Sequence, residues 1–329
     1  MTRYVVLGAG GIGIAVGVLL KSVGNDVLLI TNKEDEASAI RANGARVVGV
    51  RDIEAYPDVR TGQVVCGSED VLLVAVKAHQ TLAALSGVEG TPKAVLSLQN
   101  GIEKEAVLAA RFGSELVITS VVQVTATRQS AGVSHCAGLE ASGLSAEYAP
   151  TRAVAQELAD ELTSSGVPTS VLEDAGALEW TKAAQWLGTS LLSAATGLTL
   201  DAVLRHRELA RVYQSLVREC AAVARALGLD LIYFPGFYSR EVLDLDEEGA
   251  IELLNELGRE FGASSMAGYR TAMELDLAHG RIPELDPTAG AVERTARTVG
   301  VSCPVLETAH ALVLARAEMN TESAQGGEL

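Results

Sequence analysis

The chain has 329 residues, with 26 Lys and Arg against 42 Asp and Glu, a formal net charge of −16. A hydrophobic fraction of 48% and a charged fraction of 21% exclude wholesale disorder, and the length suggests two domains. The acidic balance argues against nucleic-acid or membrane-surface partners. The four cysteines lie far apart without a CxxC pair, which predicts reduced thiols in a cytoplasmic protein and no metal site: Cys66, Cys136, Cys220 and Cys303.

The first 20 residues resemble a secretory signal, because a charge-free run over 4–20 follows Arg3. Several glycines interrupt this run, which lowers its apolarity and its helix propensity, and its 17 residues are short for a membrane span. A second apolar run follows at 26–30 instead of a cleavage site. We therefore interpret the segment as a buried strand over 3–8, a glycine turn and a helix that ends near Ser22.

Strands and helices then alternate along the first half of the chain. The strands are nearly continuous in apolar residues, which predicts a parallel sheet covered by helices on both faces. A Gly- and Ser-rich stretch over 132–147 predicts a β-hairpin. The remaining predicted strands are 27–31, 71–76, 94–98, 116–124 and 167–172, and the predicted helices are 34–43, 80–85, 103–112 and 151–165.

From Asp174 onward helical periodicity dominates and the strand pattern stops. The sequence therefore predicts an α/β chain: a Rossmann-type parallel-sheet domain over 1–173, an all-helical domain over 174–320, and a disordered tail over 321–329. The predicted helices of the second domain are 175–196, 201–227, 239–245, 247–261, 268–279, 286–299 and 305–318.

The glycine turn is a GxGxxG motif that follows the first predicted strand and opens a helix. Its first glycine makes the tight turn, its second lets a pyrophosphate approach the backbone, and its third lets the helix pack against the strand. The helix N-terminus then stabilises the phosphate charge. In this context the motif predicts dinucleotide binding through Gly8, Gly10, Gly11, Ile12 and Gly13, although such a turn also occurs in other α/β proteins.

The residues after the second strand bear on the choice of cofactor. An NAD site usually has Asp or Glu there to bind the ribose 2′-hydroxyl, whereas this chain has Asn32 and Lys33. Uncharged and basic groups suit a 2′-phosphate, so NADP is favoured over NAD. The alternative is that Lys33 faces solvent and Glu34 binds the ribose.

Two further strand ends carry polar residues where a parallel sheet binds ligands. Lys77 follows the third strand, and Asn100 follows the fourth. A Lys there can meet an anionic group, and an Asn can donate and accept near a carbonyl. Both also fit a solvated Lys and an ordinary Asn-Gly turn, and the role of His79 is left open.

The helix after the predicted boundary is almost free of charge: no charged residue follows Lys182 until Asp201. A Lys on a mostly buried helix is costly unless it faces a cleft, where it could protonate a developing alkoxide. The alternative is a Lys near the helix start that reaches out to water. At 100° per residue one polar stripe contains Lys182, Gln185, Trp186, Thr189 and Ser193.

Two segments near the C-terminus carry candidate ligand groups. Ser265 is predicted to lie at a helix N-terminus, where hydroxyl and N–H groups bind a carboxylate. Glu284 lies before another predicted helix and could orient a water or a substrate hydroxyl. Plain helix capping by Ser265 and Asp286 is the alternative.

Taken together, the motifs resemble the ketopantoate reductase (2-dehydropantoate 2-reductase) family over nearly the whole chain. The resemblance implies an NADP-binding Rossmann domain plus a helical substrate and dimerisation domain, with the substrate between them, NADPH as cofactor and a homodimer. It also implies that Lys182 is the general acid, Glu284 its polar partner, Asn100 and Ser265 substrate-binding groups, and Lys77 a neighbour of cofactor and substrate. The matching motifs are GAGGIG at 8–13, VKAHQ at 76–80, QNG at 99–101, EWTK at 179–182, SSM at 264–266, GRIPELD at 280–286 and, more weakly, GVSH at 132–135.

This chain departs from the family pattern at several positions. Trp186 and Ser190 stand where the family commonly has Asn in the substrate site, Asn32 stands where it commonly has Arg, and the segment 268–279 is longer than usual. Three functions follow as hypotheses: reduction of 2-dehydropantoate to pantoate, reduction of another 2-oxo acid, ketone or imine, and a non-catalytic dinucleotide-binding sensor.

Overall fold

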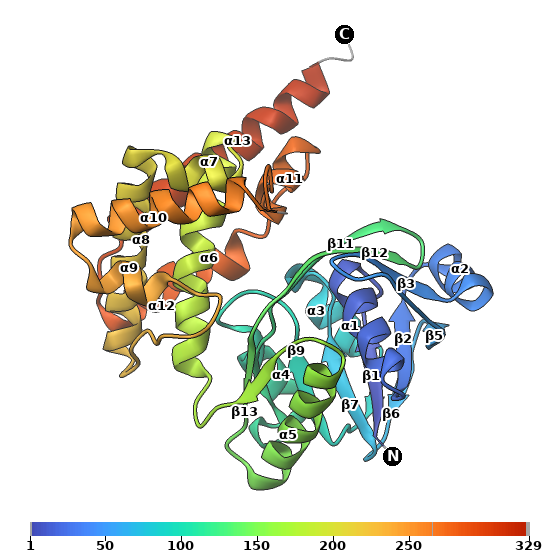
Figure 1. The fold of residues 1–329 in the computed structure, drawn as a ribbon. Helices are drawn as coiled ribbons and strands as arrows, with labels where there is room; N and C mark the ends of the chain where they lie inside the picture. Colours follow the sequence, from blue (N-terminus) through green and yellow to red (C-terminus); the bar gives the residue numbers. More distant parts are fainter. Residues whose placement is uncertain (1, 265, 327–329) are drawn as a thin grey trace. The chain divides into compact units, whose positions relative to one another are not determined.

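The computed structural model of the chain describes residues 2–264 and 266–326 and divides into two compact units. The N-terminal unit ends at Ala175, and the C-terminal unit begins at Gly176. In Figure 1 the first runs from blue to green and the second from yellow-green to red. Among the described residues, none of the helices combines the length and apolarity that crossing a membrane requires.

The centre of the N-terminal unit is a five-stranded sheet whose strands are all parallel. Leu7 pairs with Ile30 and with Val74, and Val74 pairs with Ser97. The carboxyl ends of four strands therefore meet along one edge of the sheet. In spatial order the strands are β5 (Asp58–Thr61), β2 (Asp26–Thr31), β1 (Arg3–Leu7), β7 (Asp70–Val74) and β9 (Ala94–Ser97).

Both faces of this sheet are buried. Tyr4 and Val6 of β1 contribute to one hydrophobic cluster, while Val5 and Leu7 contribute to another. Alternate residues of one strand point to opposite faces, so continuous apolar runs were needed to fill both clusters. The helical segments of this unit are α1 (Gly11–Ser22), α2 (Glu34–Asn43), η1 (Ala78–Gln80), α3 (Thr81–Ser86), α4 (Lys104–Phe112), η2 (Ser114–Leu116) and α5 (Ala149–Ser164).

Three smaller sheets complete the unit, and they correct part of the prediction. The segment 116–124 does not continue the central sheet as a full strand, because only Val117 bridges to Val95 before β10 pairs with β13. The hairpin comes earlier than predicted and consists of β11 and β12. The sheets are β11 (Val124–Ser130), β12 (Val133–Leu139), β3 (Ala45–Gly49) and β4 (Ile53–Ala55); β10 (Thr119–Val121), β13 (Ser142–Ser145) and β14 (Thr169–Val171); and β6 (Val64–Cys66) with β8 (Val88–Gly90).

The described part of the C-terminal unit consists of helices and the loops that join them, which confirms the predicted fold class. The long helix α6 contacts six other helical segments of this unit, α7, α8, α9, α11, α13 and η3. Gly188 on α6 allows the ring of Tyr213 on α8 to pack against the helix backbone. The elements are α6 (Gly176–Thr196), α7 (Leu200–Arg205), α8 (Arg207–Ala226), α9 (Ser239–Asp244), α10 (Glu247–Gly262), α11 (Ala272–Ala278), η3 (Asp286–Gly290), α12 (Ala291–Val299) and α13 (Pro304–Gly326).

The structure corrects the bounds of several predicted helices in this unit. The helix predicted over 201–227 is interrupted at His206, which ends α7 and begins α8. The last helix extends to Gly326, so residues 321–326 are helical where a disordered tail was predicted. Residues 327–329 of that predicted tail lie outside the described residues.

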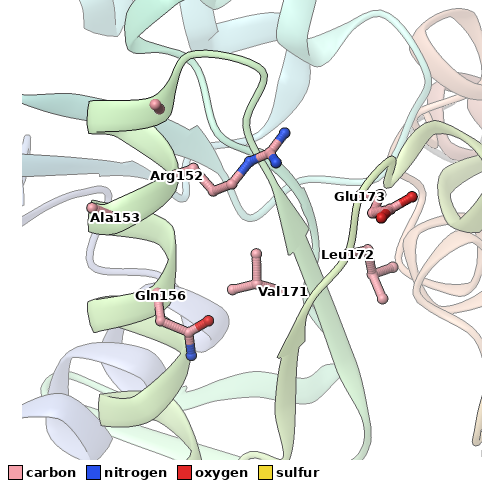
Figure 2. A pocket seen from close by; sticks show the side chains of 7 residues that line it. Arg152, Ala153, Gln156, Val171, Leu172 and Glu173 are labelled. Atoms are coloured by element: carbon pink, nitrogen blue, oxygen red, sulfur yellow. The ribbon is translucent and has the colours of Figure 1, made fainter.

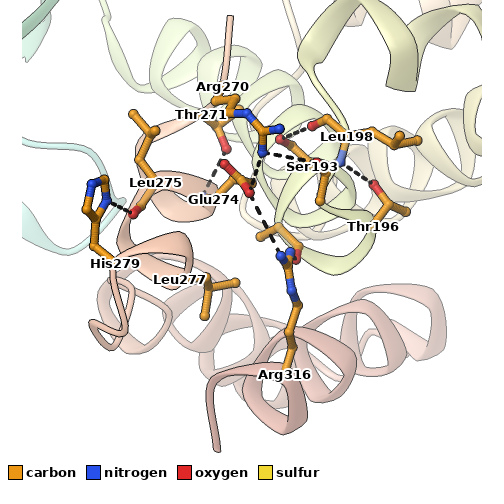
Figure 3. A network of polar contacts seen from close by, with 12 residues as sticks. Ser193, Thr196, Leu198, Arg270, Thr271, Glu274, Leu275, Leu277, His279 and Arg316 are labelled. Carbon is orange, nitrogen blue, oxygen red and sulfur yellow. Dashed lines mark hydrogen bonds and ion pairs between the residues drawn. The ribbon is translucent and has the colours of Figure 1, made fainter. Parts of the chain in front are cut away.

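A network of ion pairs around the buried carboxylate of Glu274 stabilises the C-terminal end of α6 (Figure 3). The side chain of Glu274 is 2% exposed and accepts a hydrogen bond of 2.7 Å from Arg270, with Arg316 at 3.8 Å. Arg270 also donates to the carbonyl of Gly197, and Arg316 donates to that of Ala194. Cations at the last carbonyls of a helix oppose the negative end of its dipole. The network therefore joins α11 and α13 to the end of α6.

Candidate functional site

The glycine turn between β1 and α1 has two tight positions and one open position. Gly8 has φ +117°, and a Cβ placed there would lie 2.9 Å from the backbone of Ala75. A Cβ at Gly13 would lie 1.9 Å from the carbonyl oxygen of Gly8. A Cβ at Gly10 would meet nothing within 4 Å. The two tight glycines pack the turn, and Gly10 leaves space in front of the backbone where a pyrophosphate could approach.

The start of α1 suits an anion. Its first turn contains no acidic residue, and its N-cap residue, Gly10, offers no side chain to bond the first N–H groups. The unpaired N–H groups and the positive end of the helix dipole are therefore left for a ligand. The turn fits the pyrophosphate of a dinucleotide in both its shape and its charge.

Gly11 is also tightly packed, in this case against the β11–β12 hairpin. A Cβ at this position would lie 2.7 Å from the backbone of Thr127 in β11. The hydroxyl of Ser134 in β12 donates to the carbonyl of Gly11 at 2.8 Å, and the neighbouring Ile12 is half-buried. The β11–β12 hairpin therefore packs directly on the beginning of α1.

A buried carboxylate holds the tip of that hairpin. Glu36 in α2 is 1% exposed, accepts from the backbone N–H of Gly132 at 2.7 Å and forms an ion pair with Arg128. Sequence reasoning missed this group, because an acid in the first turn of a helix is usually solvated and supports the helix dipole.

The end of β2 presents the groups that were predicted to select the cofactor. Asn32 and Lys33 are exposed directly after the strand. Glu34 accepts hydrogen bonds from Arg41 at 2.6 Å and from Thr61 at 2.9 Å. The bond from Arg41, followed by that from Thr61, lowers the pKa of the Glu34 carboxyl. This carboxylate is thus paired within the unit.

Lys77 and Asn100 lie at the same edge of the sheet as the glycine turn. Both are exposed, Lys77 in the turn after β7 and Asn100 in the turn after β9. The aligned strand ends place both turns along this edge, and the turn after β7 lies directly against Gly8. His79 is exposed in η1.

The helix α6 presents Lys182 and Trp186 half-buried and one turn apart, whereas Ser190 is 2% exposed. Lys182 lies in the first third of the helix and is followed by a charge-free stretch over 183–200. Lys182 and Trp186 are therefore more accessible than Ser190.

Three residues of the predicted polar stripe form hydrogen bonds with nearby groups of the same unit: Gln185, Thr189 and Ser193. Gln185 accepts from the backbone N–H of Tyr238 at 2.7 Å and donates to the carbonyl of Gly236 at 3.2 Å. Thr189 bonds back to carbonyls of its own helix, and Ser193 donates to Leu198 O at 2.8 Å. The stripe is thus partly a structural feature that holds loops onto α6.

The Ser-Ser-Met segment does not precede a helix in the way predicted. The hydroxyl of Ser264 donates to Phe261 O at the end of α10, and Ser265 lies outside the described residues. The next helix, α11, begins at Ala272, and its cap is Thr271, whose hydroxyl accepts from the N–H of Glu274. The predicted helix start at 268 was therefore wrong.

Glu284 is half-buried and lies two residues before η3, which contacts α6 within the same unit. Its carbonyl accepts a hydrogen bond from the hydroxyl of Thr288. The exposed Asp286 forms an ion pair with Arg294 at 2.6 Å. The segment of Glu284 is therefore anchored through η3 to the helix that carries Lys182.

A separate open groove of about 410 Å³ lies between α5 and β14 (Figure 2). The guanidinium of Arg152 at its rim donates to the carbonyl of Ala146. None of the predicted site residues lines this groove. Its lining consists of Ala149, Arg152, Ala153, Gln156, Val171, Leu172 and Glu173.

Within residues 2–264 and 266–326, no cluster of three His, Cys, Asp or Glu side chains is arranged to hold a metal ion. All four cysteines are free and buried. Burial raises the pKa of the Cys66 thiol to about 11, so this thiol is protonated at neutral pH.

The chain matches curated relatives over nearly its whole length. A 2-dehydropantoate 2-reductase of Halobacterium salinarum is 26% identical over 316 residues, covering 94% of this chain and 97% of the relative. One from Mycobacterium tuberculosis is 27% identical over 312 residues, covering 92% and 94%.

Solved structures share the fold. A D-mandelate dehydrogenase with NADH and anilino(oxo)acetate has a TM-score of 0.82 at 22% identity, covering 97% of this chain and 99% of that one. A PanE/ApbA family ketopantoate reductase from Ralstonia eutropha has a TM-score of 0.78 at 24% identity, with the same coverage.

Two family models match the chain in order. Residues 4–146 match the ketopantoate reductase PanE/ApbA model, and residues 174–317 match the model of the ketopantoate reductase PanE/ApbA C terminal. Together they span most of both units. The chain belongs to the ketopantoate reductase family and is an oxidoreductase of the 2-dehydropantoate 2-reductase type.

Proposed function

We propose that the protein is an NADPH-dependent reductase of a 2-oxo acid, 2-dehydropantoate in the first place, with Lys182 as general acid. The observation that carries this proposal is the half-buried Lys182 on a helix whose next 18 residues, 183–200, have no charge. An amine in this position could give a proton to the oxygen of a carbonyl substrate. The family and the relatives' names support the same reaction.

The chemistry divides between the two units. NADPH, when bound at the glycine turn, supplies a hydride to the keto carbon. Lys182 gives a proton to the carbonyl oxygen, which would otherwise become an alkoxide on the product. Glu284 serves as the polar partner of Lys182, and Asn100 and Ser265 bind the substrate.

The test of this function is NADPH oxidation with 2-dehydropantoate and with a panel of other 2-oxo acids, followed at 340 nm. We expect turnover with 2-dehydropantoate well above the background without substrate. Turnover with another 2-oxo acid and none with 2-dehydropantoate would overturn the substrate. Tight NADPH binding without turnover on any substrate would favour the sensor hypothesis.

A preference for NADPH over NADH is predicted from the end of β2, where Asn32 and Lys33 are exposed and Glu34 is engaged by Arg41 and Thr61. We expect Lys33→Ala to weaken NADPH binding about tenfold, because it removes a charge-assisted contact worth roughly 1.5 kcal/mol, and to leave NADH binding unchanged. Fluorescence titration of both dinucleotides measures this.

Lys21→Ala is the matched control, because Lys21 lies in the last turn of α1, at the end opposite the glycine turn. It should bind NADPH as the wild type does. Equal affinity of the wild type for NADH and NADPH would contradict the assignment of the cofactor.

A second candidate substrate class is a 2-oxo acid with an aromatic side chain. Trp186 is half-buried one turn from Lys182, at a position where the family resemblance implies an amide. An indole offers an apolar surface and removes hydrogen-bonding capacity. The solved structures with a similar fold include a D-mandelate dehydrogenase, and mandelate carries a phenyl ring.

We therefore expect Trp186→Asn to raise kcat/KM for 2-dehydropantoate relative to 2-oxo-2-phenylacetate by about tenfold, since a change of pocket contacts is worth roughly 1–3 kcal/mol. Parallel assays of both substrates give this ratio. An unchanged ratio would remove Trp186 from substrate selection.

We further propose a homodimer and a cytoplasmic location, the latter supported by the free and buried thiols.

A further inference from the structure

Gln99 makes three side-chain hydrogen bonds at the carboxyl edge of the central sheet. Its amide nitrogen donates to the carbonyl of Val76 at 2.6 Å and to the hydroxyl of Thr81 at 2.7 Å. Its amide oxygen accepts from the hydroxyl of Ser97 at 2.9 Å. Gln99 is half-buried and Thr81 is buried, so these bonds are shielded from water.

These bonds join the turns that carry the predicted ligand groups. Val76 directly precedes Lys77, and Gln99 directly precedes Asn100. Val76 also lies against the glycine turn, because its backbone nitrogen would be 2.9 Å from a Cβ at Gly8. One side chain therefore connects the ends of β7 and β9 at the point where β7 meets the dinucleotide turn.

We propose that Gln99 is a positioning residue that holds Lys77 and Asn100 in register with the glycine turn. It touches neither cofactor nor substrate, and it acts through the two turns. The inference rests on the proposed function, since it takes Lys77 and Asn100 as the ligand-binding groups. A misplacement of a binding group by about 1 Å is sufficient to change a rate by up to ~10²-fold.

The chemistry of the amide explains why glutamine stands here. Val76 O requires a donor and the Ser97 hydroxyl requires an acceptor, and one amide supplies both. A glutamate lacks the donor, and a methionine of similar length lacks both groups. Methionine fills about the same space without adding a charge, so a loss of function in Gln99→Met reports on the hydrogen bonds and not on the volume.

The test measures NADPH affinity and kcat/KM in Gln99→Met, in Lys77→Ala and in the double variant. We expect Gln99→Met to raise the NADPH Kd and to lower kcat/KM about tenfold. In the Lys77→Ala background the same substitution should change the Kd less than threefold, because its effect passes through Lys77. Thr81→Val removes one of the three bonds and should give a smaller loss of the same kind, which covers the case that Gln99→Met does not fold.

Asn25→Leu is the matched control for stability. Asn25 is also half-buried and donates to Leu20 O at 3.2 Å and to Glu161 at 2.8 Å, but it lies before β2, at the opposite edge of the sheet. We expect it to lower the Tm as Gln99→Met does while keeping the wild-type Kd and kcat/KM.

Three outcomes overturn the positioning role: a wild-type Kd in Gln99→Met, multiplicative losses in the double variant, or an equal loss of affinity in Asn25→Leu. The proposed function fails separately, when the wild type itself turns over no 2-oxo acid. The Kd measurements still decide the role of Gln99 in that case.

Discussion

The Lys182→Met enzyme is expected to reduce its 2-oxo acid ~10²–10⁴-fold more slowly than the wild type, which is the usual contribution of a positioned acid. Methionine retains an unbranched chain of similar length in the half-buried site on α6 but has no proton to give. The Kd for NADPH should remain within about twofold of the wild-type value, because residues of the other unit form the glycine turn. Single-turnover kinetics at saturating NADPH measure the rate.

Two controls separate acid catalysis from charge. Lys182→Arg keeps a cation but does not release its proton at neutral pH, so it should be nearly as slow as Lys182→Met. Lys93→Met removes a surface lysine that is paired with Glu157 and Thr2, and it should keep the wild-type rate. A wild-type rate in Lys182→Met would remove Lys182 from the mechanism.

Four of the five strands of the central sheet and the glycine turn could be predicted because their signals are local. The strands β1, β7 and β9 are uninterrupted apolar runs, and the helix predicted over 34–43 has those bounds in the structure, where Gly44 follows it with φ +74°. Each of these patterns is complete within a few residues.

The short strands β3 to β6 were missed because their partners are distant or their residues are half exposed. β3 pairs with β12, so that Val47 meets Ser134, and exposed residues alternate with buried ones in β5. No local window contains both members of such a pair, and alternation over three to five residues is also common in loops.

In the candidate site, the cap of α11 could have been found from the sequence. Thr271 is followed by Glu274 three residues later, which is the spacing of a capping box. The Ser-Ser-Met match instead favoured a helix N-terminus at Ser265. By contrast, the bonds of Gln185 to the loop that contains Gly236 and Tyr238 depend on tertiary contacts across about 50 residues. Spacing on one helix cannot reveal such contacts.

A Gly13→Ala chain is expected to lose dinucleotide binding together with part of its stability. The added Cβ would lie 1.9 Å from the carbonyl oxygen of Gly8 and 3.1 Å from the Cβ of Ala75. Backbone atoms cannot yield as the end of a side chain does, so α1 must move away from β1 and take the phosphate-binding N–H groups with it. Overpacking of this kind costs about 1–3 kcal/mol of unfolding free energy.

Gly10→Ala separates an effect on ligand binding from an effect on folding, because the added Cβ would have no neighbouring protein atom within 4 Å. It should unfold at the wild-type urea midpoint and yet bind NADPH at least tenfold more weakly, since the methyl group occupies the space through which the pyrophosphate approaches. Gly13→Ala should fail in both measurements. If Gly10→Ala binds NADPH as the wild type does, the phosphates do not lie at the open position of the turn. If Gly13→Ala binds NADPH as the wild type does, the contact with Gly8 does not hold helix α1 in place.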